Sequence, residues 1–95
     1  MIKHILLFKF KQGISEEEKN KGIEMLKALK KIPEIIEWEI GVQRKKSDKF
    51  YDFAQVSSFE SVEAIERFSK NPEHEKVRAY LKERADWVKV DYDLF

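Results

Sequence analysis

The chain has 95 residues, the length of one small domain, and we expect residues 1–95 to form a single unit. Hydrophobic residues make up 42% and charged residues 39%, and the formal net charge of +1 predicts no nucleic-acid or membrane partner. Cysteine is absent, which excludes disulfides and thiolate chemistry. No apolar run is long enough to span a membrane, and the first residues lack a signal-peptide pattern, so we expect a cytoplasmic protein.

Residues 2–11 predict a strand with apolar side chains on both faces. One face would carry Ile2, His4, Leu6, Phe8 and Phe10, and the other would carry Ile5 and Leu7. A strand with one solvated face alternates between apolar and polar residues, which this segment does not do in its middle. We therefore expect both faces of its sheet to be covered.

The next segment predicts a helix and then a β-hairpin. Ser15 and Glu18 form a capping-box pattern, an apolar stripe follows, and Pro33 ends a helix that extends to about residue 31. Residues 35–44 and 51–59 predict paired strands joined by a basic, solvated loop, with Gly41 as a candidate β-bulge.

Two further helices and a strand complete the predicted elements. Ser61 caps a short helix whose inward residues are expected to be Val62, Ile65 and Phe68. Asn71 and Pro72 open a second helix with His74, Val77 and Leu81 on one stripe. Residues 87–94 predict the fourth strand.

This order, β-α-β-β-α-α-β, predicts a ferredoxin-like α+β fold with a four-stranded antiparallel sheet and helices on one face. The other face of the sheet carries apolar residues and would be bare in a monomer. We therefore expect two copies to pair sheet to sheet as a homodimer.

Four short motifs lie in order along almost the whole chain. They are MIKHILLFKFK at residues 1–11, FESVEA at 59–64, NPEH at 71–74 and VDY at 90–92. Together they resemble the stress-responsive A/B barrel family, abbreviated Dabb. The resemblance implies a dimeric α+β barrel in which two sheets enclose a central cavity.

The resemblance also implies site residues. In a plant member that closes a polyketide chain by aldol condensation, two cavity histidines match His4 and His74, whereas a tyrosine and a third histidine match Phe68 and Phe53. We expect a ligand cavity that contains His4, Phe8, Phe53, Phe68 and His74. We expect no polyketide-cyclase activity of the plant kind, because a phenyl ring cannot donate a hydrogen bond to an enolate.

His74 is the candidate catalytic residue. It lies in the first turn of a predicted helix, where the helix dipole disfavours the imidazolium and leaves a neutral imidazole as a general base. The structural alternative is that it orders the preceding turn. His4 is either a core histidine with a polar neighbour or a ligand contact. The candidate donors to an enolate oxygen are Tyr51, Tyr80 and Tyr92.

The sequence predicts no metal site and no cofactor, because its two histidines have no carboxylates at ligand spacing. Some Dabb relatives hold a magnesium ion with backbone carbonyls where the first helix ends. By resemblance, the matching positions are Leu29, Ile32 and Ile35.

Two functions follow as alternatives. The first is a stress-response-type homodimer of undefined role that binds a small apolar ligand in its central cavity. The second is a cofactor-free lyase or cyclase that acts on a carbonyl compound with His74 as general base. An open cavity with His74 and an oxyanion donor would favour the enzyme. A cavity filled by Phe8, Phe53 and Phe68 would favour the binding role.

Overall fold

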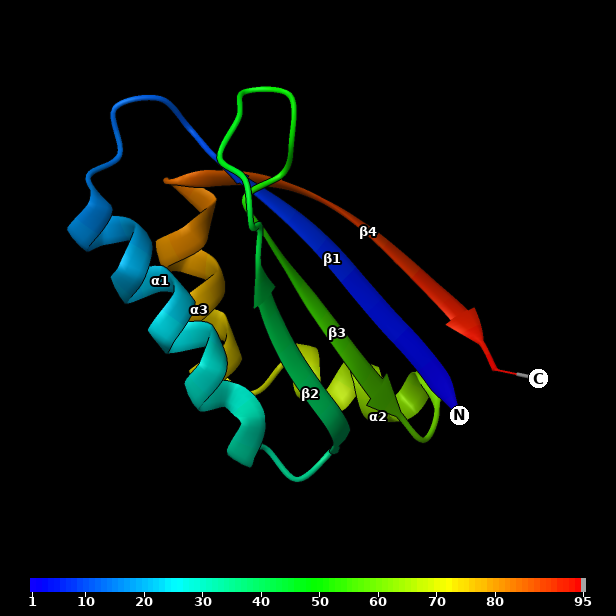
Figure 1. Cartoon of the computed structure of the whole chain (residues 1–95). Helices are drawn as coiled ribbons and strands as arrows, with labels where there is room; N and C mark the ends of the chain where they lie inside the picture. The colour runs from blue at the N-terminus through cyan, green and yellow to red at the C-terminus, as the bar shows by residue number, and fades with distance from the viewer. Residues whose placement is uncertain (95) are drawn as a thin grey trace.

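A four-stranded antiparallel sheet with helices against one face forms the framework of this computed structural model, which describes residues 1–94 (Figure 1). The strands are β1 (Ile2–Phe10), β2 (Ile35–Val42), β3 (Phe53–Phe59) and β4 (Ala85–Asp93). The helices are α1 (Glu16–Ala28), α2 (Val62–Ser69) and α3 (Pro72–Lys82), and a 3-10 turn, η1 (Leu29–Lys31), continues α1. The predicted order of elements and the ferredoxin-like sheet are confirmed. No helix within residues 1–94 is long and apolar enough to cross a membrane.

The strand order β2-β3-β1-β4 places β1 in the interior of the sheet. Residues opposite one another on antiparallel strands point to the same face, so alternate cross-strand rows that include β1 point toward the helices. Three of these rows contain side chains that line a pocket. The rows are Ser57–His4–Asp91, Gln55–Leu6–Lys89 and Phe53–Phe8–Trp87. Side chains from the start of the chain and from residues 85–93 therefore lie side by side on the face that the helices cover.

The helices begin where the capping residues predict. Ser15 and Glu18 form the reciprocal capping box of α1, the Ser61 side chain caps α2, and the Asn71 side chain caps α3 with Pro72 in its first turn. Each cap satisfies a backbone N–H that the helix leaves free. The buried faces of these helices pack on the sheet and form the core, which contains Phe8, Leu26, Leu29, Ile32, Phe53, Phe59, Ala64, Phe68, Val77 and Leu81.

Two local predictions are wrong. Gly41 pairs in register with Ala54, and the β2–β3 register shifts instead between Ile35 and Glu37. Val62 does not point inward, since it is 55% exposed; Ala64 and Phe68 are the buried residues of α2. The two buried residues of α2 are four positions apart, about one helical turn. Such a short stripe does not determine from sequence alone which side of the helix packs on the sheet.

The face of the sheet away from the helices, here called the outer face, is apolar. Exposed Leu7, Val88, Val90 and Tyr92 lie on it with Ile5 and Val56. Leu6 and Phe8 point the other way, into the protein. The doubly apolar β1 thus buries one row of side chains under the helices and presents a second row to solvent in a single chain.

Candidate functional site

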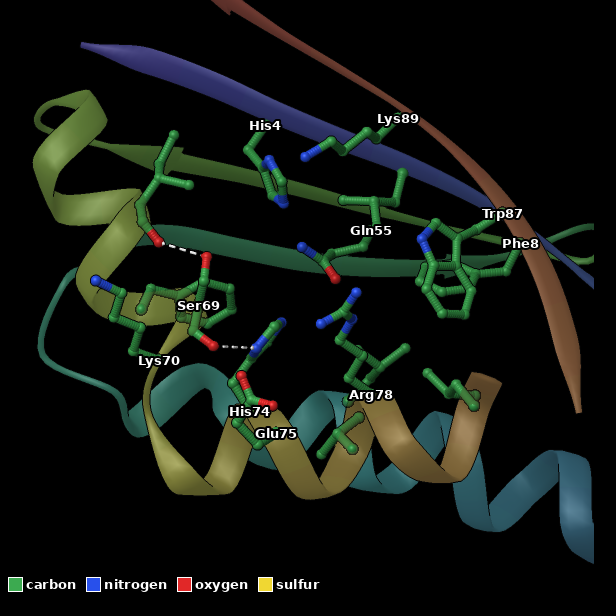
Figure 2. Close-up of a pocket in the computed structure, with 16 residues that line it drawn as sticks. His4, Phe8, Gln55, Ser69, Lys70, His74, Glu75, Arg78, Trp87 and Lys89 are labelled. Carbon is green, nitrogen blue, oxygen red and sulfur yellow. Dashed lines mark hydrogen bonds between the residues drawn. The ribbon is translucent and has the colours of Figure 1, made fainter. Parts of the chain in front are cut away.

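A pocket with a volume of about 420 Å³ lies between the sheet and helices α2 and α3 (Figure 2). This volume is in the range of small-molecule sites. The helix side contributes Leu26, Ile65, Phe68, Ser69, Lys70, His74, Glu75, Val77, Arg78 and Leu81, and the sheet contributes His4, Leu6, Phe8, Gln55, Trp87 and Lys89. The pocket belongs to one protomer. The expected cavity between two sheets therefore does not contain these residues, because they lie on the face of the sheet that the helices cover.

His74 enters the pocket from the first turn of α3. Its Nδ1 lies 3.1 Å from the backbone carbonyl oxygen of Ser69 at the end of α2. A carbonyl only accepts, so Nδ1 donates the proton and Nε2 is the unprotonated nitrogen. Figure 2 shows the second ring nitrogen directed into the pocket. The ring packs against Phe68, with centroids 4.5 Å apart.

Burial lowers the pKa of His74 below its ordinary value of 6.5, and the hydrogen bond to Ser69 opposes this shift only in part. The charged form is disfavoured because it loses hydration inside the pocket. At neutral pH the side chain is therefore a neutral imidazole with its free lone pair toward the pocket.

His4 lies across the pocket on β1, and its partner is a carboxylate. Its Nδ1 is hydrogen-bonded to Asp91 Oδ1 from the neighbouring strand β4, and its ring meets Phe59 edge to face. Because the carboxylate accepts, Nδ1 carries the proton and Nε2 faces the pocket. His4 is thus both a buried histidine with a polar partner and part of the pocket wall.

Four of the five expected cavity residues line the pocket. The exception is Phe53, which is buried in the core and stacks on Phe8 with ring centroids 4.5 Å apart. None of the three candidate tyrosine donors lines it: the Tyr80 hydroxyl donates to the Glu18 carbonyl oxygen, and Tyr51 and Tyr92 are exposed elsewhere. The pocket is open, and the phenylalanines do not fill it.

Sequence reasoning did not predict the other polar residues of the wall, which include Gln55, Arg78 and Lys89. Their signal is present but weak. Arg78 follows His74 by four residues, one helical turn, and positions 87, 89 and 91 alternate on one face of β4. Recognising them requires knowing that β4 pairs with β1.

The backbone carbonyls at the end of α1 accept hydrogen bonds from backbone N–H groups. Leu29 accepts from the Ile32 N–H at 2.9 Å, and Ile32 accepts from the Ile35 N–H at 3.1 Å. Within residues 1–94, no three His, Asp or Glu side chains are grouped to hold a metal ion. These carbonyls lack the carboxylates that usually anchor magnesium.

The fold and pocket define a class: small ferredoxin-like α+β proteins with a site enclosed by the helices and one face of the sheet. The stress responsive A/B barrel domain model matches residues 2–94. The chain belongs to this Dabb family. An uncharacterized protein of Streptomyces coelicolor is 32% identical over 98% of this chain and 99% of its own length.

Two solved structures are similar over nearly the whole chain. A dimeric ferredoxin-like protein of unknown function from Bacteroides fragilis is 29% identical, with a TM-score of 0.82 over 98% of this chain and 95% of that one. A hydroxynitrile lyase from Passiflora edulis is 21% identical, with a TM-score of 0.85 over 99% and 93%, respectively. The second likeness shows the fold alone.

Proposed function

We propose that this protein is a cofactor-free acid–base enzyme that acts on a small carbonyl compound, with His74 as the general base. The environment of the His74 ring is the main support. Its Nδ1–H is held by the Ser69 carbonyl, and its Nε2 faces an open pocket. Burial lowers its pKa, so the basic form is present at neutral pH.

The elementary step is removal of a proton from a carbon next to a carbonyl group. The C–H bond breaks, its electron pair moves toward the carbonyl oxygen, and the proton passes to His74 Nε2. The resulting imidazolium can return the proton to carbon or to a leaving oxygen. His4, whose Nδ1 is bonded to Asp91, lies on the opposite wall and is placed to exchange a second proton.

The developing enolate oxygen needs a hydrogen-bond donor. Gln55 and Arg78 line the same pocket and have N–H groups, so they take the role that the sequence assigned to a tyrosine. This arrangement differs from the plant cyclase that the family resemblance suggests, because an amide and a guanidinium replace a phenol. The absence of plant-type polyketide cyclisation stays a prediction.

The fold by itself does not decide the reaction, but it is compatible with carbonyl chemistry. The Passiflora edulis protein of the same fold is described as a hydroxynitrile lyase. The proposal for this chain is a broader one, proton abstraction next to a carbonyl, and it rests on His74 and its neighbours.

Deuterium exchange tests this proposal. We expect purified protein in D₂O to accelerate exchange of the protons next to the carbonyl of 4-phenyl-2-butanone, followed as loss of their proton NMR signals. His74→Asn should reduce the acceleration at least about 100-fold, since general-base catalysis typically contributes about 10²–10⁴. Lys76→Gln, an exposed change on α3 outside the pocket, is the matched control. Exchange at the buffer rate, or equal exchange by wild type and His74→Asn, would contradict the proposal.

A second candidate is a binding protein without catalysis. The apolar wall made by Leu26, Phe8, Phe68 and Trp87 favours it, because such a surface suits an apolar guest. Saturable binding of 4-phenyl-2-butanone without any exchange would identify this function. A role in stress and a cytoplasmic location stay predictions.

We also propose that the protein works as a homodimer. The apolar outer face supports this, because two such faces would cover Leu7, Val88 and Val90. The similar Bacteroides fragilis protein is described as dimeric. The pocket lies on the opposite side of the sheet, so each protomer would keep a complete site.

A further inference from the structure

Two cationic side chains project into the pocket from opposite walls. Arg78 comes from α3 and Lys89 from β4; Figure 2 shows Arg78 directed from the helix toward the sheet and Lys89 extending along the sheet toward His4. Among residues 1–94, neither forms an ion pair with an acidic side chain, whereas Arg67, Lys76 and Arg84 do. An unpaired cation is ordinary on an open surface, but two that line one pocket favour an anion there.

The charges around the pocket are unequal. Three cationic side chains, Lys70, Arg78 and Lys89, line it with a single acidic one, Glu75. Glu75 is exposed, as are Arg78 and Lys89, and Asp91 is bonded to His4. The charged side chains that line the pocket therefore carry a net positive charge.

A buried amide lies in the same wall. Gln55 is only 3% exposed, and its Nε2 donates to Ser57 Oγ at 3.4 Å, while that hydroxyl donates to the His4 carbonyl oxygen. An amide has two N–H groups, and the hydrogen bonds within residues 1–94 use one of them. A buried polar group of this kind favours a ligand oxygen as its second partner.

The remainder of the wall is aromatic. Phe8 and Trp87 lie 5.6 Å apart, centroid to centroid, at one end, and Phe68 packs on His74 at the other. Aromatic rings favour a flat apolar body over a hydrated one. A ligand that suits this pocket therefore has an apolar part and a negative group.

We propose that the pocket selects a carboxylate-bearing carbonyl compound with an apolar body, whose carboxylate is held by Arg78 and Lys89. The planar guanidinium matches the two carboxylate oxygens, and the ammonium adds a second charge. The carbonyl would then lie between Gln55 and His74, and with Arg78 engaged by the carboxylate, Gln55 would be the donor to the carbonyl oxygen. The carbonyl part rests on the proposed function; the anionic part rests only on the charges and the buried amide.

Equilibrium binding separates the two parts. We compare 4-phenylbutanoate with its neutral amide, 4-phenylbutanamide, by isothermal titration calorimetry at low ionic strength and near pH 7. We expect the acid to bind about tenfold or more tightly than the amide, since a charged pair in a partly enclosed site is stronger than a neutral contact. Raising the salt concentration should weaken the binding of the acid and leave the binding of the amide unchanged.

The variants Arg78→Gln and Lys89→Gln should each reduce this preference, and the double variant should abolish it. Lys76→Gln lies on the same helix as Arg78 but outside the pocket, so it should keep the full preference. Equal binding of acid and amide by wild type, no binding of either compound, or an unchanged preference in the double variant would overturn the inference. A stronger preference for 2-phenylethyl phosphate than for 4-phenylbutanoate would overturn the assignment to a carboxylate.

His74→Asn distinguishes this inference from the proposed function. The variant should keep the preference for the acid, because Arg78 and Lys89 are unchanged, while it loses proton exchange. If wild type prefers the acid but exchanges no proton, the proposed function fails and the anion site stands. If His74-dependent exchange occurs without a preference for the acid, the anion site fails alone.

Discussion

The two nitrogens of His74 have separate tasks at the scale of the single residue. Nδ1 is held by a backbone carbonyl at the end of α2, which determines the tautomer and the orientation of the ring, while Nε2 faces the pocket. A histidine on the surface would exchange tautomers freely and would need no fixed partner. The same ring thus contacts the end of α2 and directs a free nitrogen into the pocket. The two roles predicted for His74, ordering the turn before α3 and acting as a base, are therefore compatible.

The lowered pKa of His74 predicts a pH dependence of stability. The unfolded chain takes up a proton near the ordinary value of about 6.5, whereas the folded protein does so only at a lower pH. Between these values the unfolded state binds more protons, so the free energy of unfolding falls as the pH decreases. His74→Asn should flatten this part of the curve in urea unfolding at fixed protein concentration between about pH 7 and pH 5.

Glu18 and Glu37 do not interfere with that measurement. Hydrogen bonds hold both pKa values below the ordinary 4.5, those of Glu18 with Ser15 and Arg84 and that of Glu37 with Ser58. The contribution of these two carboxylates to the free energy of unfolding is therefore lost at lower pH. Identical slopes for wild type and His74→Asn would show that His74 is not the titrating group.

Residue type decided which site residues the sequence could reveal. Two histidines in a chain of 95 residues are conspicuous, and the positions of His4 and His74 together with the family resemblance indicate them as site residues. Arg78 and Lys89 belong to the 19 Lys and Arg residues, which are mostly on the surface. Only the pairing of β4 with β1 and the packing of α3 bring them into the pocket.

At the scale of the element, α1 depends on its first turn. Ser15 accepts from the Glu18 N–H at 3.1 Å, Glu18 reaches back to the Ser15 N–H, and its second carboxylate oxygen accepts from Arg84 Nε at 3.0 Å. The capping box thus also connects the start of α1 to the end of α3. Arg84 lies over the Tyr80 ring, 3.8 Å from its centroid, which keeps the guanidinium in place.

We predict that Ser15→Ala lowers the free energy of unfolding by about 1 kcal/mol, the usual value of an N-cap side chain. Glu18→Gln should have a smaller effect, because glutamine keeps the reciprocal hydrogen bond of the box and loses only the charge of a partly exposed pair. Chemical denaturation of both variants measures the difference. An equal or larger loss for Glu18→Gln would mean that the contact with Arg84 is the stronger one.

Local patterns predicted elements better than they predicted register. Ser15, Ser61 and Asn71 mark helix starts because a cap is made within four residues, and the chain contains that information locally. The shift in register lies at Ile36 and not at Gly41, because it depends on how two strands align across the hairpin. The same reason explains why the strand expected at residues 87–94 begins at Ala85, opposite Phe10.

At the scale of the whole molecule, the outer face predicts association. Leu7→Lys should place a charge in the proposed interface, and light scattering should then show 11.4 kDa monomers where wild type gives dimers at micromolar concentration. Thermal unfolding of wild type should depend on protein concentration, and that of the variant should not.

Val62→Lys is the matched control for this change. It replaces another exposed aliphatic residue, but on α2 and away from the outer face, so it should leave the dimer intact. A wild-type monomer, or equal effects of the two substitutions, would contradict the assignment of the outer face. Pairing through β1 stays a prediction, and Leu7 is the residue of β1 that tests it, because Leu6 and Phe8 point into the protein.

The interior position of β1 also has a consequence for the order of events on the ribosome. His4 is translated early, and Asp91 leaves the exit tunnel only after every helix has been made. Until β4 is released, a nascent chain lacks one neighbour of β1 and three apolar residues of the outer face, Val88, Val90 and Tyr92. The pocket wall and the proposed dimer face are therefore completed by the same late segment.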